Sequence, residues 1–222
     1  MKLLNSKFCR IISVIVLHIV VCGWSIVYFK HLNESGKLLS TLGASQYLPQ
    51  ITLQSVMVNL PAIILLIVSL LLLKKKAAEF FCFKIEKKIA KILVPVLAVV
   101  YAISLVRQLI VYDDQVTQAF RWVYYLVFIS FFEEFECRAV MPALLKGRVC
   151  KWVEWLLPSL LFAVGHLIMP IVQGKDLAEL GMILMSTIGG YTLFGLFFEW
   201  CKRASGSLWV GVLLHAIMDF GI

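Results

Sequence analysis

Long apolar segments dominate this sequence, and short polar stretches separate them. A helix needs about 20 apolar residues to cross the hydrocarbon core of a bilayer. On that basis we expect seven transmembrane helices, at roughly 11–29, 55–73, 92–111, 122–145, 155–172, 178–198 and 207–222. The chain is 61% hydrophobic and 15% charged, whereas about a quarter of the residues of a soluble domain are charged. The sequence therefore predicts an all-α polytopic membrane protein without a separate soluble domain.

The first apolar segment follows three basic residues, which is also typical of a signal peptide. Its apolar run continues to Phe29 without a small-residue cleavage site after it, so we expect it to be retained. Fifteen Lys and Arg residues fall on the side of the N-terminus and five on the opposite side. Because cytoplasmic loops carry the excess of Lys and Arg, we expect the N-terminus in the cytoplasm and the C-terminus outside. The net charge of +8 is thus related to topology and does not indicate nucleic acid.

The segment between the second and third predicted spans, about 74–91, mixes aromatic and aliphatic residues with lysines. This pattern is typical of an amphipathic helix that lies on anionic lipid, although a charged loop would have the same composition. The six cysteines show no paired spacing. They indicate neither a disulfide framework nor a metal knuckle.

A charged cluster interrupts the fourth predicted span and is the strongest functional signal in the chain. It comprises Glu133, Glu134, Glu136 and Arg138. Ionisable groups at membrane depth are costly and usually mark function. Glu134 and Arg138 are four residues apart and could pair on one helix face. Glu133 is rotated by about 100° from its neighbour, so it could face a cavity.

Three further ionisable residues lie inside predicted spans: His166, His215 and Asp219. His215 and Asp219 are four apart and would share one helix face. By count along their helices, these residues and Glu133 fall near the same depth. Such a set could activate a water by general base catalysis or hold a metal. Polar side chains that only bridge helices are the alternative, and we expect that role for His18.

Together these residues form a pattern that resembles the CPBP family, the CaaX-processing and bacteriocin-processing intramembrane proteases, also called ABI. The pattern covers roughly residues 120–222, and Gly206–Trp209 resembles the family's lead-in to the last motif. Its three parts are Glu133-Glu134-x-x-x-Arg138, Phe162-x-x-x-His166 and His215-x-x-x-Asp219.

The resemblance implies a conical bundle core that carries an intramembrane active site in residues 120–222, with residues 1–119 forming N-terminal transmembrane helices. Glu133 and His166 would activate water, and His215 and Asp219 would contribute an oxyanion or metal site. Glu134 and Arg138 would shape the pocket. Asp219 stands where the eukaryotic CaaX proteases have Asn. Zinc is compatible with a set of Glu133, His166, His215 and Asp219, although the chain lacks the local HExxH spacing of zinc proteases.

We therefore expect an intramembrane endopeptidase, from a bacterial plasma membrane, that cleaves a prenylated CaaX-type, leader or bacteriocin-related peptide. A non-catalytic bacteriocin immunity or scaffolding protein of the same family is the alternative. A proton-coupled transporter would also use intramembrane carboxylates and histidines, but the sequence lacks the paired repeats of that class.

Overall fold

A computed structural model describes residues 7–73 and 84–221 of the chain. The described residues form helices and turns and contain no strand. Within them, four helices are long and apolar enough to cross a membrane, Lys7–Glu34, Lys88–Val111, Lys151–Val172 and Leu177–Ser205, and Leu208–Phe220 is a shorter apolar helix. The prediction of a polytopic, all-helical membrane protein is confirmed.

The helices occur in the following order: α1 Lys7–Glu34, η2 Ala44–Gln46, α2 Leu48–Val58, α3 Leu60–Leu73, α5 Lys88–Val111, α6 Gln115–Val123, η4 Tyr124–Phe131, α7 Phe132–Glu134, η5 Phe135–Val140, α8 Met141–Leu145, α9 Lys151–Gly165, α10 Ile168–Val172, α11 Leu177–Ser205 and α12 Leu208–Phe220. The predicted helix at 74–91 falls largely on residues 74–83, which lie outside the described residues. Helix α5 begins at Lys88.

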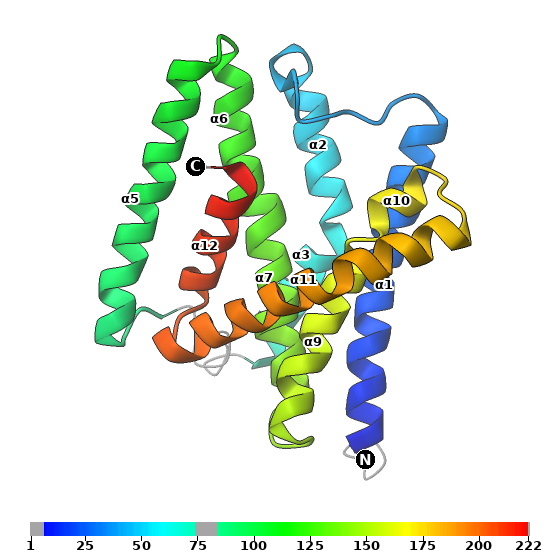
Figure 1. Ribbon diagram of the computed structural model, residues 1–222, viewed down its shortest axis with the longest axis vertical. Coiled ribbons are helices and arrows are strands. Elements are labelled where there is room, and N and C mark those ends of the chain that lie inside the picture. The colour runs from blue at the N-terminus through cyan, green and yellow to red at the C-terminus, as the bar shows by residue number, and fades with distance from the viewer. Residues whose placement is uncertain (1–6, 74–83, 222) are drawn as a thin grey trace. The chain divides into compact units, whose positions relative to one another are not determined.

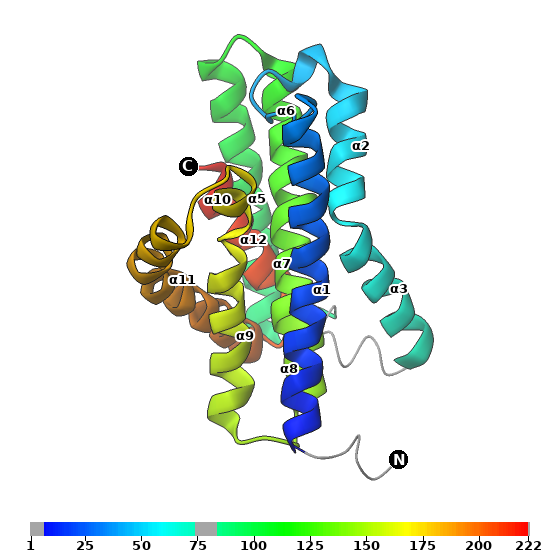
Figure 2. The ribbon, with the colours of Figure 1, turned by 90° about the vertical axis from the view of Figure 1, so that its right-hand side faces the viewer.

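The expected span at 55–73 is not one helix. It breaks at Asn59, where α2 ends and α3 begins, and Figure 2 shows the change of direction. Pro61 has no N–H to donate to the carbonyl of Met57, four residues earlier, and its ring disfavours a continuous helix there. The Met57 carbonyl instead accepts from the backbone N–H of Asn59. The side-chain amide of Asn59 donates to the Ser55 carbonyl at 2.9 Å.

The expected span at 155–172 also breaks, between α9 and α10 at His166 and Leu167. The break lies four residues before Pro170, at the carbonyl that a proline cannot bond and with which its ring clashes. His166 therefore sits at the end of a helix rather than within one. Pro170 therefore accounts for the position of the break at His166.

The charged cluster lies in a helical stretch that changes type twice. The segments η4 and η5 are π-helical, and the single short α-helical turn α7 between them carries Glu133 and Glu134. Pro142 is the second residue of α8, two positions after the end of η5. Local π adjustments let a membrane helix tolerate the backbone groups that a proline leaves without a partner. Such segments are rare and often occur at functional sites.

The chain divides into two compact units, each made of parts distant in sequence. The first unit comprises Met1–Leu38 and Glu136–Trp200, and the second comprises Leu39–Phe135 and Cys201–Ile222. In the first unit α1 packs along α8, α9 and α10 (Figure 2). Its core consists of Val14, Cys137, Met141, Leu145 and Phe162.

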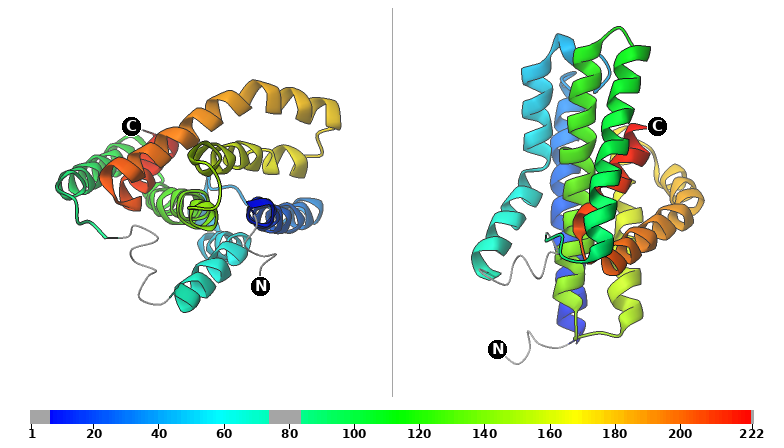
Figure 3. Two further views of the ribbon diagram at one scale, coloured as in Figure 1. Left: turned by 90° about the horizontal axis from the view of Figure 1, so that it is seen from below. Right: turned by 90° about the vertical axis from the view of Figure 1, so that its left-hand side faces the viewer.

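In the second unit α12 packs between α5 and η4, as Figures 1 and 3 show. Its core consists of Tyr101, Ala216, Ile217 and Phe220, with Leu97, Trp122, Tyr125 and other partly buried residues around them. This packing brings the residues of α7 and those of α12 into one unit. The sites of the two units are therefore described separately below.

Candidate active site

One imidazole and three carboxylates meet in the second unit. The Nδ1 atom of His215 on α12 lies 3.2 Å from Oε1 of Glu134 on α7. Its Nε2 atom lies 3.7 Å from Oε2 of Glu133 and 3.4 Å from Oδ2 of Asp219. The structure thus brings together four of the six predicted site residues: Glu133, Glu134, His215 and Asp219.

The carboxylates of this cluster differ in exposure. The Glu134 side chain is fully buried, whereas 38% of the Glu133 side chain and 32% of the Asp219 side chain are exposed. Glu133 and Glu134 are about 100° apart around the helix axis, and this angle predicts that one is more exposed than the other. Glu134 can therefore orient the imidazole through Nδ1, while the Glu133 and Asp219 side chains beside Nε2 are each partly exposed, with Oε2 of Glu133 itself buried.

The turn between α11 and α12 sets the direction of α12, the helix that carries His215. Gly206 has φ of +71°, and a Cβ atom at this position would lie 2.8 Å from Cε of Lys87. Glycine adopts this conformation without steric cost. The Lys87 ammonium donates to the carbonyls of Arg203 and Ala204 at 3.1 and 3.3 Å. It thereby caps the C-terminus of α11, where a cation is favourable.

His166 lies in the first unit, at the C-terminal end of α9. Its Nδ1 atom is 2.9 Å from the carbonyl oxygen of Phe162. Because a carbonyl only accepts, Nδ1 must carry the hydrogen, which leaves the lone pair of a neutral imidazole on Nε2. The ring also stacks on Tyr191 of α11 with centroids 3.6 Å apart and planes inclined by 22°. These two contacts fix both the tautomer and the plane of the imidazole.

Arg138 is also in the first unit, where it is 1% exposed. Its guanidinium carbon lies 4.5 Å from the centroid of the Phe162 ring and 5.7 Å from that of Phe198. Cations are attracted to the faces of aromatic rings, more strongly where water is excluded. Phe162 therefore serves two predicted site residues, since its ring contacts Arg138 and its carbonyl accepts from His166. The convergence of His166 and Arg138 with the four residues of the second unit stays a prediction.

The first unit also contains a buried pair of His18 and Glu136, of which the sequence predicted only the role of His18. His18 bonds Oε1 of Glu136 through Nδ1 at 3.1 Å, with both side chains less than a tenth exposed. The interhelical role expected for His18 is confirmed, but its partner was not predicted. The Cys22 sulfur lies 3.4 and 3.7 Å from the two ring nitrogens.

The described residues do not contain a group of three or more His, Cys, Asp or Glu side chains arranged to hold a metal ion. Zinc binds imidazole nitrogen and carboxylate oxygen at about 2.0–2.2 Å. In the second unit the carboxylates are divided between the two nitrogens of His215. The zinc set predicted from the sequence also includes His166, which lies in the first unit, so that set stays a prediction, and the chemistry proposed below uses only the residues of this chain.

Comparison with known proteins identifies one family. Residues 115–221 match the family model described as Rce1-like, type II CAAX prenyl endopeptidase Rce1-like. The match covers all six predicted site residues and confirms the resemblance drawn from the three motifs. No curated protein and no solved structure matches the chain significantly.

Proposed function

We propose that this integral membrane protein, whose residues 115–221 belong to the CPBP family, hydrolyses a peptide bond near or within the bilayer. The observation that carries the proposal is the placement of Glu133 and Asp219 beside Nε2 of His215, with the buried Glu134 on Nδ1. A histidine that only bridges two helices needs one hydrogen-bond partner. Here three carboxylates surround one imidazole, and such a group of intramembrane ionisable residues supports a role in proton transfer.

In the proposed mechanism Glu133 is the general base, because it is the most exposed carboxylate of the cluster. It takes a proton from water as the oxygen attacks the scissile carbonyl, and it later returns that proton to the leaving amine. His166 accepts a hydrogen bond from the same water through the lone pair on Nε2. It holds the water in line for attack, so the proposal requires Glu133 and His166 to face one chamber.

The tetrahedral intermediate carries negative charge on the former carbonyl oxygen and needs hydrogen-bond donors. We assign this role to His215 in its protonated form, whose Nδ1–H donates to Glu134 and whose Nε2–H can donate to the oxyanion, and to Asp219 in its protonated form. Glu134 would then act on His215 rather than on substrate. Arg138, held between Phe162 and Phe198, would shape the pocket wall.

The family description points to a prenylated peptide of the CAAX type as the first substrate to test. Leader and bacteriocin-related peptides are the next class. The distribution of Lys and Arg supports a cytoplasmic N-terminus, and we place the protein in a bacterial plasma membrane on that basis.

The experiment compares hydrolysis of a fluorogenic prenylated CAAX peptide and of a leader-peptide panel by purified protein in detergent. The variants are Glu133→Gln and Glu179→Gln; the second makes the same change at an exposed carboxylate paired with Lys175. We expect Glu133→Gln to lose at least about 100-fold in rate and Glu179→Gln to match wild type. A zinc chelator should leave the rate unchanged. If wild type cleaves a peptide and Glu133→Gln cleaves it equally, the proposal is wrong. If wild type cleaves none, the immunity role takes its place.

A further inference from the structure

Tyr101 in α5 forms a reciprocal pair with Trp122, which lies just before the π-helical segment η4. The Tyr101 hydroxyl donates to the Trp122 carbonyl at 2.6 Å, and the Trp122 indole N–H donates to the Tyr101 carbonyl at 2.9 Å. The two rings stack with centroids 4.9 Å apart and planes inclined by 17°. Tyr101 is 1% exposed. It lies outside residues 115–221, the part that matches the family model.

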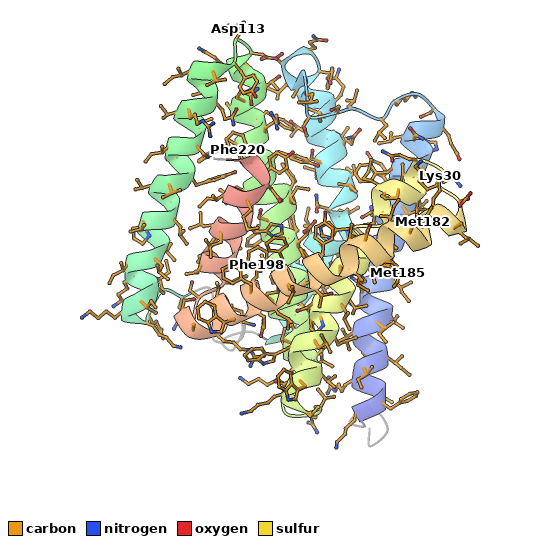
Figure 4. All side chains as sticks on the ribbon, viewed as in Figure 1. Lys30, Asp113, Met182, Met185, Phe198 and Phe220 are labelled. Atoms are coloured by element: carbon orange, nitrogen blue, oxygen red, sulfur yellow. The ribbon has the colours of Figure 1, made fainter. Side chains whose placement is uncertain are left out.

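The same side chain packs against α12. Its ring meets that of Phe220, labelled in Figure 4, edge-on at 6.0 Å, and it shares a buried cluster with Ala216 and Ile217. Phe220 directly follows Asp219, and Ala216 directly follows His215. One residue of α5 therefore contacts α12 directly and also contacts Trp122 of α6, the helix that continues through η4 into α7.

The bond to Trp122 falls where the helix changes from α to π geometry. The hydrogen-bond register shifts there from four residues to five, and each extra residue in a turn rotates everything after it. Inside a bilayer, water cannot satisfy a backbone group that such a shift leaves without a partner, whereas a neighbouring side chain can. The hydroxyl of Tyr101 donates to the Trp122 carbonyl at this position. The rotation that it stabilises determines the direction in which Glu133 and Glu134 project, about three turns further along.

We infer that Tyr101 is a positioning residue of the active site, which sets the approach of Glu133 to His215 through Trp122 and Phe220. The inference rests on the proposed function for its effect on cleavage. Its effect on the geometry of the cluster does not depend on any cleavage, so the two can be tested apart. It also implies that α5 is part of the working enzyme, although the family match begins after it.

The test uses Tyr101→Phe, which removes one oxygen and keeps the stacked ring. Tyr125→Phe is the matched control, because Tyr125 packs on the same Phe220 ring at 6.3 Å. We expect kcat for the best peptide to fall by about tenfold to a hundredfold in Tyr101→Phe, as small misplacements of reacting groups do. KM should change less than threefold, and Tyr125→Phe should match wild type in both.

The second readout needs no substrate. The chain has four histidines, so ring-labelled histidine gives an NMR spectrum with four assignable signals. In Tyr101→Phe the signal of His215 should shift, while those of His18, His31 and His166 stay in place. General loosening of the fold would move all four. An unchanged His215 signal overturns the inference, whatever the cleavage result. A shifted signal in a protein that cleaves nothing would support the inference and contradict the proposed function.

Trp122→Phe provides an independent variant, since it removes the indole donor and keeps an aromatic ring. It should shift the His215 signal in the same direction as Tyr101→Phe. If the two variants shift it oppositely, or if only Trp122→Phe does so, Tyr101 does not act through this pair and the inference fails.

Discussion

The imidazole of His166 lies flat on the ring of Tyr191, with the two centroids 3.6 Å apart. Tyr191 belongs to none of the three motifs identified in the sequence, and it lies on α11. The stacking fixes the ring plane, and the bond from Nδ1 to the Phe162 carbonyl fixes the tautomer. His166 is therefore held as an acceptor before any substrate arrives.

Tyr191→Phe should keep near wild-type cleavage, because the stacked ring remains. Tyr191→Ala should reduce kcat by about tenfold or more, since the imidazole is then free to turn out of line. The measurement is kcat and KM for the best peptide, with thermal unfolding followed in parallel. A loss of equal size in both variants would show that the hydroxyl, and not the ring, is what matters.

The buried pair of His18 and Glu136 should contribute to stability rather than to chemistry. Removing one partner, as in His18→Ala or Glu136→Ala, leaves a polar group buried without compensation, which typically costs about 3–5 kcal/mol. Replacing both with leucine should recover much of that loss. Thermal unfolding in detergent measures each variant. If the double variant is as unstable as the sum of the two single ones, the pair is not coupled.

Gly195 permits the close approach of α11 to α9. A Cβ atom here would lie 2.8 Å from Cβ of Ser159, whereas at Gly190, one turn or so earlier, it would meet nothing within 4 Å. Small residues commonly allow membrane helices to approach closely, and Gly195 does so here. We expect Gly195→Ala to destabilise by about 1–3 kcal/mol through overpacking. Gly190→Ala, the control on the same helix, should be neutral or slightly stabilising.

Asp114 connects the short helix η2 to the start of α6. Its carboxylate accepts from the hydroxyls of Ser45 and Thr117, both at 2.6 Å, and from the backbone N–H of Thr117 at 3.0 Å. These hydrogen bonds, that of Ser45 foremost, hold the pKa of Asp114 below its ordinary value.

A carboxyl with a lowered pKa in the folded state stabilises the fold above its unfolded pKa, about 3.9, and loses that contribution as the pH falls through the folded value. Wild type should therefore lose thermal stability below about pH 4 relative to Asp114→Asn. At pH 7 the variant should be the less stable of the two. A difference in melting temperature between the two proteins that stays constant from pH 7 down to pH 3 would contradict this assignment.

Some of this structure could be predicted from the sequence and some could not. Apolar length predicted the helices, and the spacing of four predicted that His215 and Asp219 would meet. The break at Asn59 was missed because a single Pro61 outweighs an apolar run. The pairing of His18 with Glu136, and of His166 with Tyr191, depends on how each helix is rotated. When a helix is apolar on all faces, its sequence does not indicate which face packs against its neighbours.

The central claim is that Glu133 and His166 act on one water molecule. The most direct test is a double-mutant cycle on kcat for peptide hydrolysis, with Glu133→Gln, His166→Gln and the double variant. Groups that act as a unit are strongly non-additive. We therefore predict that each single variant loses about as much activity as the double one. Losses that multiply, or a His166→Gln variant as fast as wild type, would contradict the account.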